Sequence, residues 1–277
     1  MSTRYVGGVL ARIYYPIGAQ LPRPAVLYAH GGGWTLGSTR SHDSTARFLC
    51  HHAGVIAISL EYPLAPEHPH PVALLAVNQA LDAVLEGQVP GVEPHTVIIA
   101  GDSAGAHLAA TVSLLRADQG TAQPVAQMLF VPVTDLSRMD TGSYHEFDHG
   151  YFLTRKHMRW YRNHYLGSRL EVATDWSVSP LLAPRTLLAH TAPAYLSVAG
   201  FDPLRDEGLA YAEALNQAGV KTTLRVNTGL IHPFVNSLGV WRGARVALRH
   251  AVEFIRGLLH DSAPSRGKDG AEECPWS

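Results

Sequence analysis

The chain has 277 residues, of which 46% are hydrophobic and 16% are charged, and its 22 basic side chains nearly balance its 23 acidic ones. This balance argues against a nucleic-acid partner or an anionic membrane surface, so a small molecule is the expected partner. Cys50 and Cys274 are too far apart to indicate a disulfide framework, and the absence of a signal-peptide core or an 18-residue apolar run predicts a cytoplasmic protein without a membrane span.

Short β-branched runs alternate along the chain with longer segments of helical period. The strand-like runs are VLARIYY (9–15), AVLYAH (25–30), VIAISLEY (55–62), TVIIAG (96–101), QMLFVPV (127–133), AYLSVAG (194–200) and TTLRVNT (222–228). Apolar residues between them recur at spacings of three and four, which is typical of amphipathic helices. These residues are Leu74, Val77, Leu81 and Val84 in one segment and Leu108, Val112 and Leu115 in another. The pattern predicts an α/β fold, a three-layer α/β/α sandwich with a mostly parallel sheet.

Two regions break the alternation. Residues 140–190 are aromatic and rich in His and Arg, and they are too long for a simple strand-to-helix connection, so we expect an inserted helical cap. Residues 261–277 carry Pro, Gly and charge without apolar periodicity, which predicts a disordered tail. The expected organisation is one catalytic domain, residues 1–260, with a cap insertion at about 140–190.

The stretch VIIAGDSAGAHLAA, residues 97–110, changes from a buried-strand pattern to a helical one at GDSAG. Ser103 therefore lies at a strand-to-helix turn. Such a turn is sharp only if the positions two before and two after the serine lack bulk, a demand that Gly101 and Gly105 meet. The turn raises the hydroxyl above the carboxyl edge of the sheet, where ligands of open α/β sheets bind. A helix-capping serine is the structural alternative, but this context favours a catalytic nucleophile.

A serine nucleophile requires donors for the oxyanion that develops on the substrate. The segment AHGGGW, residues 29–34, follows an apolar strand directly, and its three glycines leave the backbone N–H groups unshielded. Gly32, Gly33 and Ala104 are the expected donors. A phosphate-binding loop is the competing interpretation, but the Lys-Ser/Thr of a P-loop does not follow and the G-x-G-x-x-G pattern is absent.

The nucleophile also requires a base and an acid that orients it. In YLSVAGFDPLRDEG, Asp202 comes just after a buried strand, and Asp206 suits the first turn of the following helix. In TTLRVNTGLIHPF, His232 lies in the loop after the next strand. Because the carboxyl ends of parallel strands meet at one sheet edge, we expect Ser103, Asp202 and His232 to share a site.

The paired histidines at 51 and 52, and at 68 and 70, have no acidic or cysteine partners at metal-ligand spacing. They are expected to be surface or loop residues. Neither a metal nor a cofactor is expected.

The motifs HGGGW, YPLAPE, GDSAG, SPLLA, DPLRDEG and HPF occur in this order over roughly residues 5–258. In these motifs the chain resembles the hormone-sensitive-lipase-like carboxylesterases of the α/β-hydrolase fold, in which the triad also follows the order Ser, Asp, His. The resemblance implies Ser103 as nucleophile, His232 as base and Asp202 as orienting acid, with Gly32, Gly33 and Ala104 as the oxyanion hole. It also implies that His30 holds the glycine loop in shape.

The predicted function is hydrolysis of short-chain acyl esters through an acyl-enzyme intermediate. A lactonase or an amidase would use the same triad, and a non-catalytic small-molecule receptor on this fold is a further alternative. Relatives in the family carry a helical cap segment ahead of their first strands, whereas a strand already begins near residue 9 here. We therefore expect a shortened N-terminal cap region, a shallow pocket and a preference for acyl chains of about two to six carbons. A homodimer is an assembly that the sequence leaves open.

Overall fold

The computed structural model describes residues 1–261, so the tail expected at 261–277 lies outside the described residues apart from Asp261. The strands are β1 (Ser2–Val6), β2 (Val9–Tyr14), β3 (Arg23–Ala29), β4 (Ile56–Glu61), β5 (Val92–Asp102), β6 (Ala126–Phe130), β7 (Ala194–Phe201) and β8 (Thr222–Ile231). The α-helices are α1 (Asp43–Ala53), α2 (Val72–Leu85), α3 (Ala104–Gln119), α4 (Gly142–Glu146), α5 (Arg155–Leu166), α6 (Arg185–Leu188), α7 (Arg205–Gln217) and α8 (Arg242–Asp261). Short 3₁₀ helices are η1 (Leu170–Thr174), η2 (Pro180–Leu182) and η3 (His232–Asn236).

The strands form one sheet in the order β1-β2-β4-β3-β5-β6-β7-β8. From β4 to β8 all neighbours are parallel, whereas β2 pairs antiparallel with both β1 and β4. The mostly parallel sheet and all seven strands expected from the sequence are confirmed. β1 was not expected, because four of its five residues are exposed and a polar edge strand has no alternating apolar pattern.

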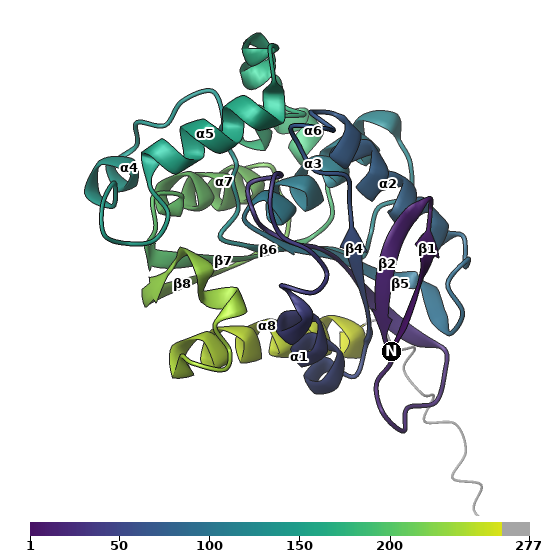
Figure 1. Cartoon of the computed structure of the whole chain (residues 1–277). Coiled ribbons are helices and arrows are strands. Elements are labelled where there is room, and N and C mark those ends of the chain that lie inside the picture. The colour runs from purple at the N-terminus through teal and green to yellow at the C-terminus, as the bar shows by residue number, and fades with distance from the viewer. Residues whose placement is uncertain (262–277) are drawn as a thin grey trace, which may run out of the picture.

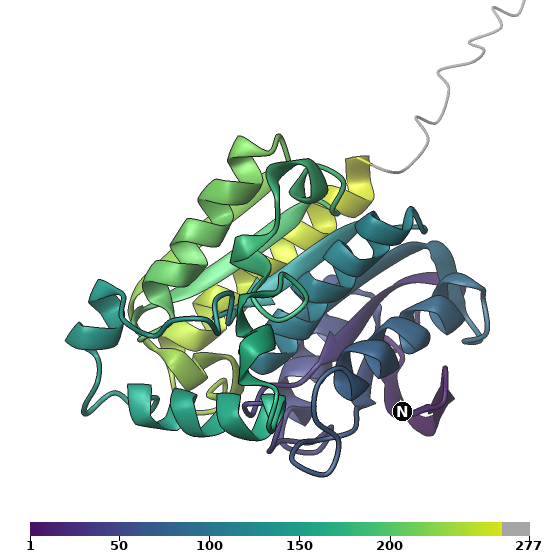
Figure 2. The same ribbon diagram turned by 90° about the horizontal axis from the view of Figure 1, so that it is seen from above.

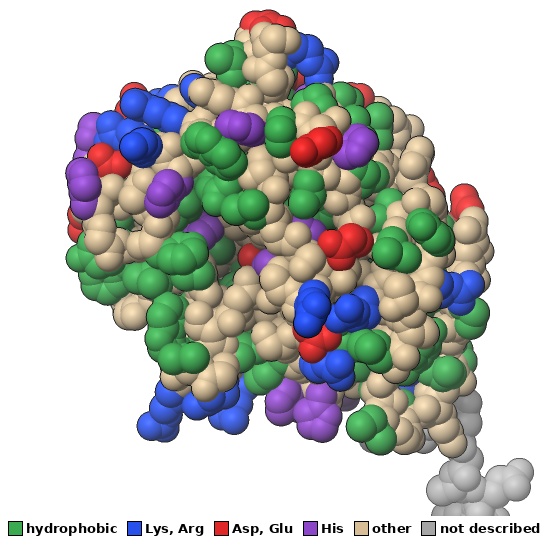
Figure 3. Space-filling view, viewed as in Figure 1, with side chains coloured by type: hydrophobic (Ala, Val, Ile, Leu, Met, Phe, Trp, Pro, Cys, Tyr) green, Lys and Arg blue, Asp and Glu red, His purple; other side chains and the backbone are tan. Residues whose placement is uncertain are grey.

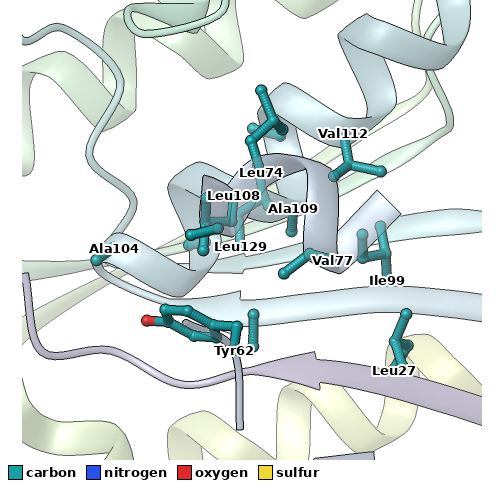
Figure 4. Packing of buried hydrophobic residues seen from close by; sticks show 14 of the residues in the cluster. Leu27, Tyr62, Leu74, Val77, Ile99, Ala104, Leu108, Ala109, Val112 and Leu129 are labelled. Atoms are coloured by element: carbon teal, nitrogen blue, oxygen red, sulfur yellow. The ribbon is translucent and has the colours of Figure 1, made fainter. Parts of the chain in front are cut away.

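Helices cover both faces of the sheet, which confirms the three-layer architecture (Figure 1). α2, α3 and α7 lie on one face, and α1 and α8 lie on the other. Because the central strands are buried on both sides, successive residues enter different cores. Ile99 of β5 lies in the cluster that also contains Val112 of α3 and Val77 of α2 (Figure 4), whereas the preceding Ile98 belongs to the cluster that contains Leu248 of α8.

The segment of residues 140–190 connects β6 to β7 and is helical, as expected, with α4, α5 and α6 and two 3₁₀ turns. In Figure 2, α2, α3 and α7 run side by side in nearly the same direction, and α5 crosses one end of this layer. Aromatic stacking anchors the segment: Tyr165, at the end of α5, lies flat against Trp34 with ring centroids 4.4 Å apart. Both rings are fully buried. The segment is thus docked against the loop that follows β3.

Candidate active site

Ser103 lies between the end of β5 and the start of α3 in a strained backbone conformation, with φ 55° and ψ −117°. A Cβ at Gly101 would lie 2.4 Å from the carbonyl carbon of Gly105. A Cβ at Gly105 would lie 2.0 Å from the carbonyl oxygen of Ala29. These approaches confirm the expectation that both flanking positions must be glycine. The Ser103 N–H donates to the carbonyl oxygen of Phe130 (2.8 Å), which fixes the turn against β6.

The structure brings Ser103, His232 and Asp202 together at the carboxyl edge of β5, β7 and β8. His232 Nε2 lies 2.9 Å from Ser103 Oγ, and His232 Nδ1 lies 2.8 Å from Asp202 Oδ2. The Asp202 carboxylate is 1% exposed, and its Oδ1 accepts a bond from the Leu204 N–H (2.9 Å). A carboxylate only accepts, so Nδ1 of His232 carries a proton and Nε2 can accept one from the serine. The geometry is consistent with a catalytic triad.

The glycine loop lies beside Ser103. Gly32 and Gly33 have φ values of 122° and 59°, which side-chain-bearing residues rarely adopt. A Cβ at Gly32 would lie 2.2 Å from the carbonyl oxygen of Leu36, so the loop is closely folded on itself. Ala104 is the first residue of α3, where helix N–H groups have no partner within the helix. Gly32 and Gly33 line the same cavity as Ser103, and Ala104 directly follows the serine in the chain.

His30 lies at the base of this loop and is fully buried. Its Nδ1 is 2.8 Å from the carbonyl oxygen of Gly31, and its ring stacks on Tyr62 with centroids 4.4 Å apart. The Tyr62 hydroxyl donates in turn to the carbonyl oxygen of His30 (2.7 Å). Burial lowers the pKa of His30. A neutral ring that donates from Nδ1 explains how the side chain ties the loop to the segment after β4.

Two buried residues near the site were not identified from the sequence. Asp102, the residue before the serine, accepts bonds from the Tyr28 hydroxyl and the Gly31 N–H, and its Oδ2 lies 3.3 Å from Nε2 of His42. Burial acts to raise the pKa of Asp102, but His42 and the neighbouring polar groups together outweigh it and lower that pKa. Burial likewise acts to lower the pKa of His42, but Asp102 and the neighbouring polar groups together outweigh it and raise that pKa. The acidic residue of GDSAG was the only sequence signal for this pair, because His42 lies 60 residues before Asp102 in the chain.

A cavity of about 210 Å³ opens above Ser103. Figure 3 shows a hollow in this face of the molecule, with hydrophobic side chains along part of its border. The 140–190 segment contributes four lining side chains, Phe152, Leu153, Met158 and Tyr161. The remaining lining residues are Gly31, Gly32, Gly33, Trp34, Leu36, Gly37, His42, Asp102, Ser103, Val133, His232, Pro233 and Asn236. One wall is thus apolar and the floor carries the polar groups.

Within residues 1–261, no three His, Cys, Asp or Glu side chains are arranged to hold a metal ion. In the same part of the chain, none of the helices has the length and apolar character needed to cross a bilayer. His51 and His52 lie at the end of α1. His70 lies in a loop, as expected, but is buried against Tyr165.

The chain was compared with known proteins. Residues 26–236 match the profile of the Abhydrolase_3 family, which is described as an alpha/beta hydrolase fold. The chain is 38% identical over 259 residues to the carboxylic ester hydrolase LipN of Mycobacterium tuberculosis, a match that covers 91% of the chain and 68% of LipN. It is 34% identical over 266 residues to an ethyl acetate hydrolase of Pseudomonas putida, covering 94% of the chain and 81% of that protein. A solved structure of a thermostable esterase from Pseudomonas putida superimposes with a TM-score of 0.88 and 33% identity over 93% of the chain and 82% of that structure.

Proposed function

The chain belongs to the hormone-sensitive-lipase-like carboxylesterases of the α/β-hydrolase fold and is an ester hydrolase, and from this premise we propose that Ser103, His232 and Asp202 carry out the reaction. One observation carries the assignment. The Ser103 hydroxyl, the His232 ring and the Asp202 carboxylate form an unbroken line with gaps of 2.9 and 2.8 Å, and the hydroxyl opens into a cavity. No other serine needs to be invoked.

In the first half of the reaction, His232 Nε2 takes the Ser103 proton while Oγ attacks the ester carbonyl carbon. Asp202 holds the ring in the tautomer that leaves Nε2 free and stabilises the imidazolium that forms. When the tetrahedral intermediate collapses, the bond to the alcohol oxygen breaks and His232 passes its proton to that oxygen. Water, activated by the same histidine, then releases the acid from Ser103.

The tetrahedral intermediate places a negative charge on the former carbonyl oxygen. We assign its stabilisation to the N–H groups of Gly32, Gly33 and Ala104, with His30 supporting the loop. The positive φ values of Gly32 and Gly33 and the helix-terminal position of Ala104 support this assignment. Each such donor is typically worth roughly 10²- to 10³-fold in kcat.

The decisive test is Ser103→Ala. We expect kcat to fall by about 10⁴- to 10⁶-fold while the melting temperature stays nearly unchanged, because the only hydrogen bond of this hydroxyl within residues 1–261 is to His232. Ser113→Ala is the matched control, since Ser113 lies on the same helix and is buried, but its hydroxyl donates to Gln123 (3.1 Å), outside the cavity. Retention of more than a few per cent of activity in pure Ser103→Ala protein would refute the assignment.

The size of the cavity supports a preference for small acyl groups. At about 210 Å³, the cavity is smaller than most drug-sized ligand pockets. Each acyl methylene contributes about 0.8 kcal/mol only while it is buried. We therefore propose that kcat/KM is highest for acyl chains of about two to six carbons.

A series of p-nitrophenyl esters from acetate to laurate measures this preference, and an optimum at eight carbons or longer would contradict it. Met158→Ala provides the matched variant, because Met158 is buried and lines the cavity from α5. Removal of the Met158 side chain should shift the optimum of kcat/KM toward longer acyl chains. An unchanged optimum in the variant would mean that the acyl chain does not bind beside Met158.

A lactone and an anilide in the same panel distinguish ester hydrolysis from lactonase and amidase activity.

Three further proposals concern organisation. We propose that residues 1–260 act as one catalytic domain in the cytoplasm, and that the 140–190 segment is its cap, because four of its side chains line the cavity. A homodimer is supported by the edge strand β8, where Leu224 and Val226 are exposed and Val226 lines the same surface groove as Val246 of α8. Val226→Lys should then give a monomer in light scattering, whereas Leu75→Lys on α2 should not; unchanged mass in both would count against β8.

A further inference from the structure

A second acid–histidine pair lies beneath the active site. Asp102 and His42 are 6% and 4% exposed, and their Oδ2 and Nε2 atoms are 3.3 Å apart. Neither side chain contacts Ser103 Oγ or His232 through any hydrogen bond of the described structure. The reaction proposed above therefore does not use this pair.

The hydrogen bonds around His42 can accommodate a ring that carries two protons. The Ser41 hydroxyl, which has one proton to give, donates to the carbonyl oxygen of Ser38 (3.0 Å). It also accepts from the Ser38 N–H (2.9 Å), and it can accept from His42 Nδ1, which lies 2.9 Å away. Nε2 faces the Asp102 carboxylate, which only accepts. A ring that donates at both nitrogens is an imidazolium, and the Asp102 carboxylate favours this charged form because it raises the pKa of His42 against the effect of burial.

The Asn236 amide lies 2.7 Å from the same Nε2 atom. An amide can present either its nitrogen or, after a half-turn, its oxygen, and a protonated Nε2 requires the oxygen. The half-turn is allowed, because the Thr45 hydroxyl near this amide also donates to the carbonyl oxygen of Val235 (2.9 Å). His42 is thus shared between the carboxylate and η3, the turn that starts with His232.

On the other side, the pair holds the glycine loop. Asp102 Oδ1 accepts from the Gly31 N–H (2.9 Å) and from the Tyr28 hydroxyl (2.7 Å). Gly31 packs so closely on this carboxylate that a Cβ there would lie 2.3 Å from Oδ2. The bond fixes the His30–Gly31 peptide plane, one residue before Gly32. Since Asp102 also precedes Ser103 in the chain, the pair touches all three parts of the site.

We propose that Asp102 and His42 are positioning residues that hold the Gly31–Gly33 backbone in register with Ser103 and His232. This inference rests on the proposed role of Gly32 and Gly33 as oxyanion donors. The charge on the pair is essential to it. An asparagine at 102 can still accept from Gly31 and Tyr28, but it cannot anchor a cationic His42, so the side chain that accepts from the loop loses the contact that fixes its orientation.

The test compares Asp102→Asn and His42→Gln with the matched control Asp43→Asn. Asp43 is adjacent to His42, and it too accepts from a tyrosine hydroxyl and from cationic side chains, but it faces Tyr14, Arg12 and Arg47 away from the loop. For each protein, kcat and KM for p-nitrophenyl butyrate are measured per active site, counted by titration with a fluorophosphonate. The inhibition constant of a trifluoromethyl ketone, which forms a tetrahedral oxyanion adduct with serine, is measured in parallel.

Asp102→Asn should lower kcat by roughly 10- to 100-fold, less than the 10²- to 10³-fold expected for deleting a donor, because the donors are displaced and not removed. KM should change by less than about threefold, and the ketone should bind more weakly by the same factor as the loss in kcat/KM. The double variant should be no worse than Asp102→Asn alone, since both changes break one pair. Asp43→Asn should leave all three constants within about threefold.

A merely structural role would reduce the number of titratable sites but not kcat per site or ketone affinity, and that result would overturn the proposal. A drop in kcat with unchanged ketone affinity would overturn it as well. If Asp102→Asn does not fold, His42→Gln decides, because it leaves Asp102 bound to Gly31 and Tyr28 and should still lower kcat and ketone affinity together. Failure of the proposed triad would appear differently, as an active Ser103→Ala or as wild-type protein that does not bind the ketone.

Discussion

His107 is a buried histidine whose two ring nitrogens are both occupied. Nε2 lies 2.9 Å from the carbonyl oxygen of Val178 in the 140–190 segment and donates to it, and Nδ1 accepts from the indole N–H of Trp34 (3.2 Å). This arrangement admits only the neutral ring. Burial lowers the pKa of His107 to about 3. The residue should therefore make the folded state sensitive to acid.

The size of the effect follows from proton linkage. In the unfolded chain a histidine has a pKa of about 6.5, so between that value and the folded-state pKa the unfolded state binds more protons. The stabilisation is fully present above about pH 6.5 and is lost as the pH falls toward the folded-state pKa. At about 1.36 kcal/mol per pKa unit, the loss between pH 7.5 and pH 5 is about 2 kcal/mol. A difference of that size shifts the melting temperature of a domain of this length by roughly 4–8 °C.

His107→Asn isolates the contribution of His107 to the free energy of unfolding, because the contributions of all other titrating groups cancel when wild type and variant are compared at the same pH. We expect the free energy of unfolding of the wild type, relative to His107→Asn, to fall by about 2 kcal/mol from pH 7.5 to pH 5, as measured by urea denaturation. Leu108→Ala, at the next position of α3, removes buried apolar surface without a titrating group, so its difference from wild type should not depend on pH. A His107→Asn difference that is equal at both pH values would show that the ring is not held neutral.

Three further predictions concern single sites. Asp202→Asn should lower kcat by about 10⁴-fold, whereas Asp206→Asn should lower it by no more than a few fold, because Asp206 accepts from the Ser143 N–H and not from His232. A larger loss of kcat in Asp206→Asn than in Asp202→Asn would mean that Asp206 is the orienting acid. Gly33→Ala should lower kcat by roughly 100-fold, because the new Cβ would lie 2.1 Å from the Tyr161 ring and the residue would have to adopt φ 59°. Adding Tyr161→Ala to this variant should restore only part of the rate, since the backbone strain at residue 33 remains. Burial raises the pKa of Glu207 well above its ordinary 4.5, so the folded state holds a proton that the unfolded state releases, and stability falls as pH rises above 4.5. Glu207→Gln should therefore gain stability relative to wild type between pH 5 and pH 8, and urea denaturation that showed a constant difference would contradict this.

The position of the site could be predicted because its determinants are local. Gly101 and Gly105 are required by backbone approaches within one turn, and a strand end precedes each of Ser103, Asp202 and His232. Parallel strands place their carboxyl ends at one edge, so local patterns were sufficient to bring the three residues together.

What the sequence could not provide are the long-range partners. His42 approaches Asp102 only because α1 returns beneath the glycine loop, and the intervening 60 residues show no periodicity that reveals this. His107 lies just after the nucleophile turn, and its contact with Val178 depends on how the 140–190 segment docks, which no local pattern reveals. Strand β1 has one buried residue, too few for a pattern.

The docking of the 140–190 segment links the shape of the cavity to the support of the glycine loop, two properties that the sequence pattern shows separately. The three glycines of HGGGW indicated a backbone left bare for the substrate, but Gly33 also provides the space in which Tyr161 of α5 lies. The next residue, Trp34, stacks on Tyr165 of the same helix. Side chains of α5 therefore line the cavity above Ser103 and also pack against the backbone that would stabilise the oxyanion. A change in α5 that admits a longer acyl chain must alter the support of the glycine loop as well, so specificity and kcat in this enzyme should change together and not independently.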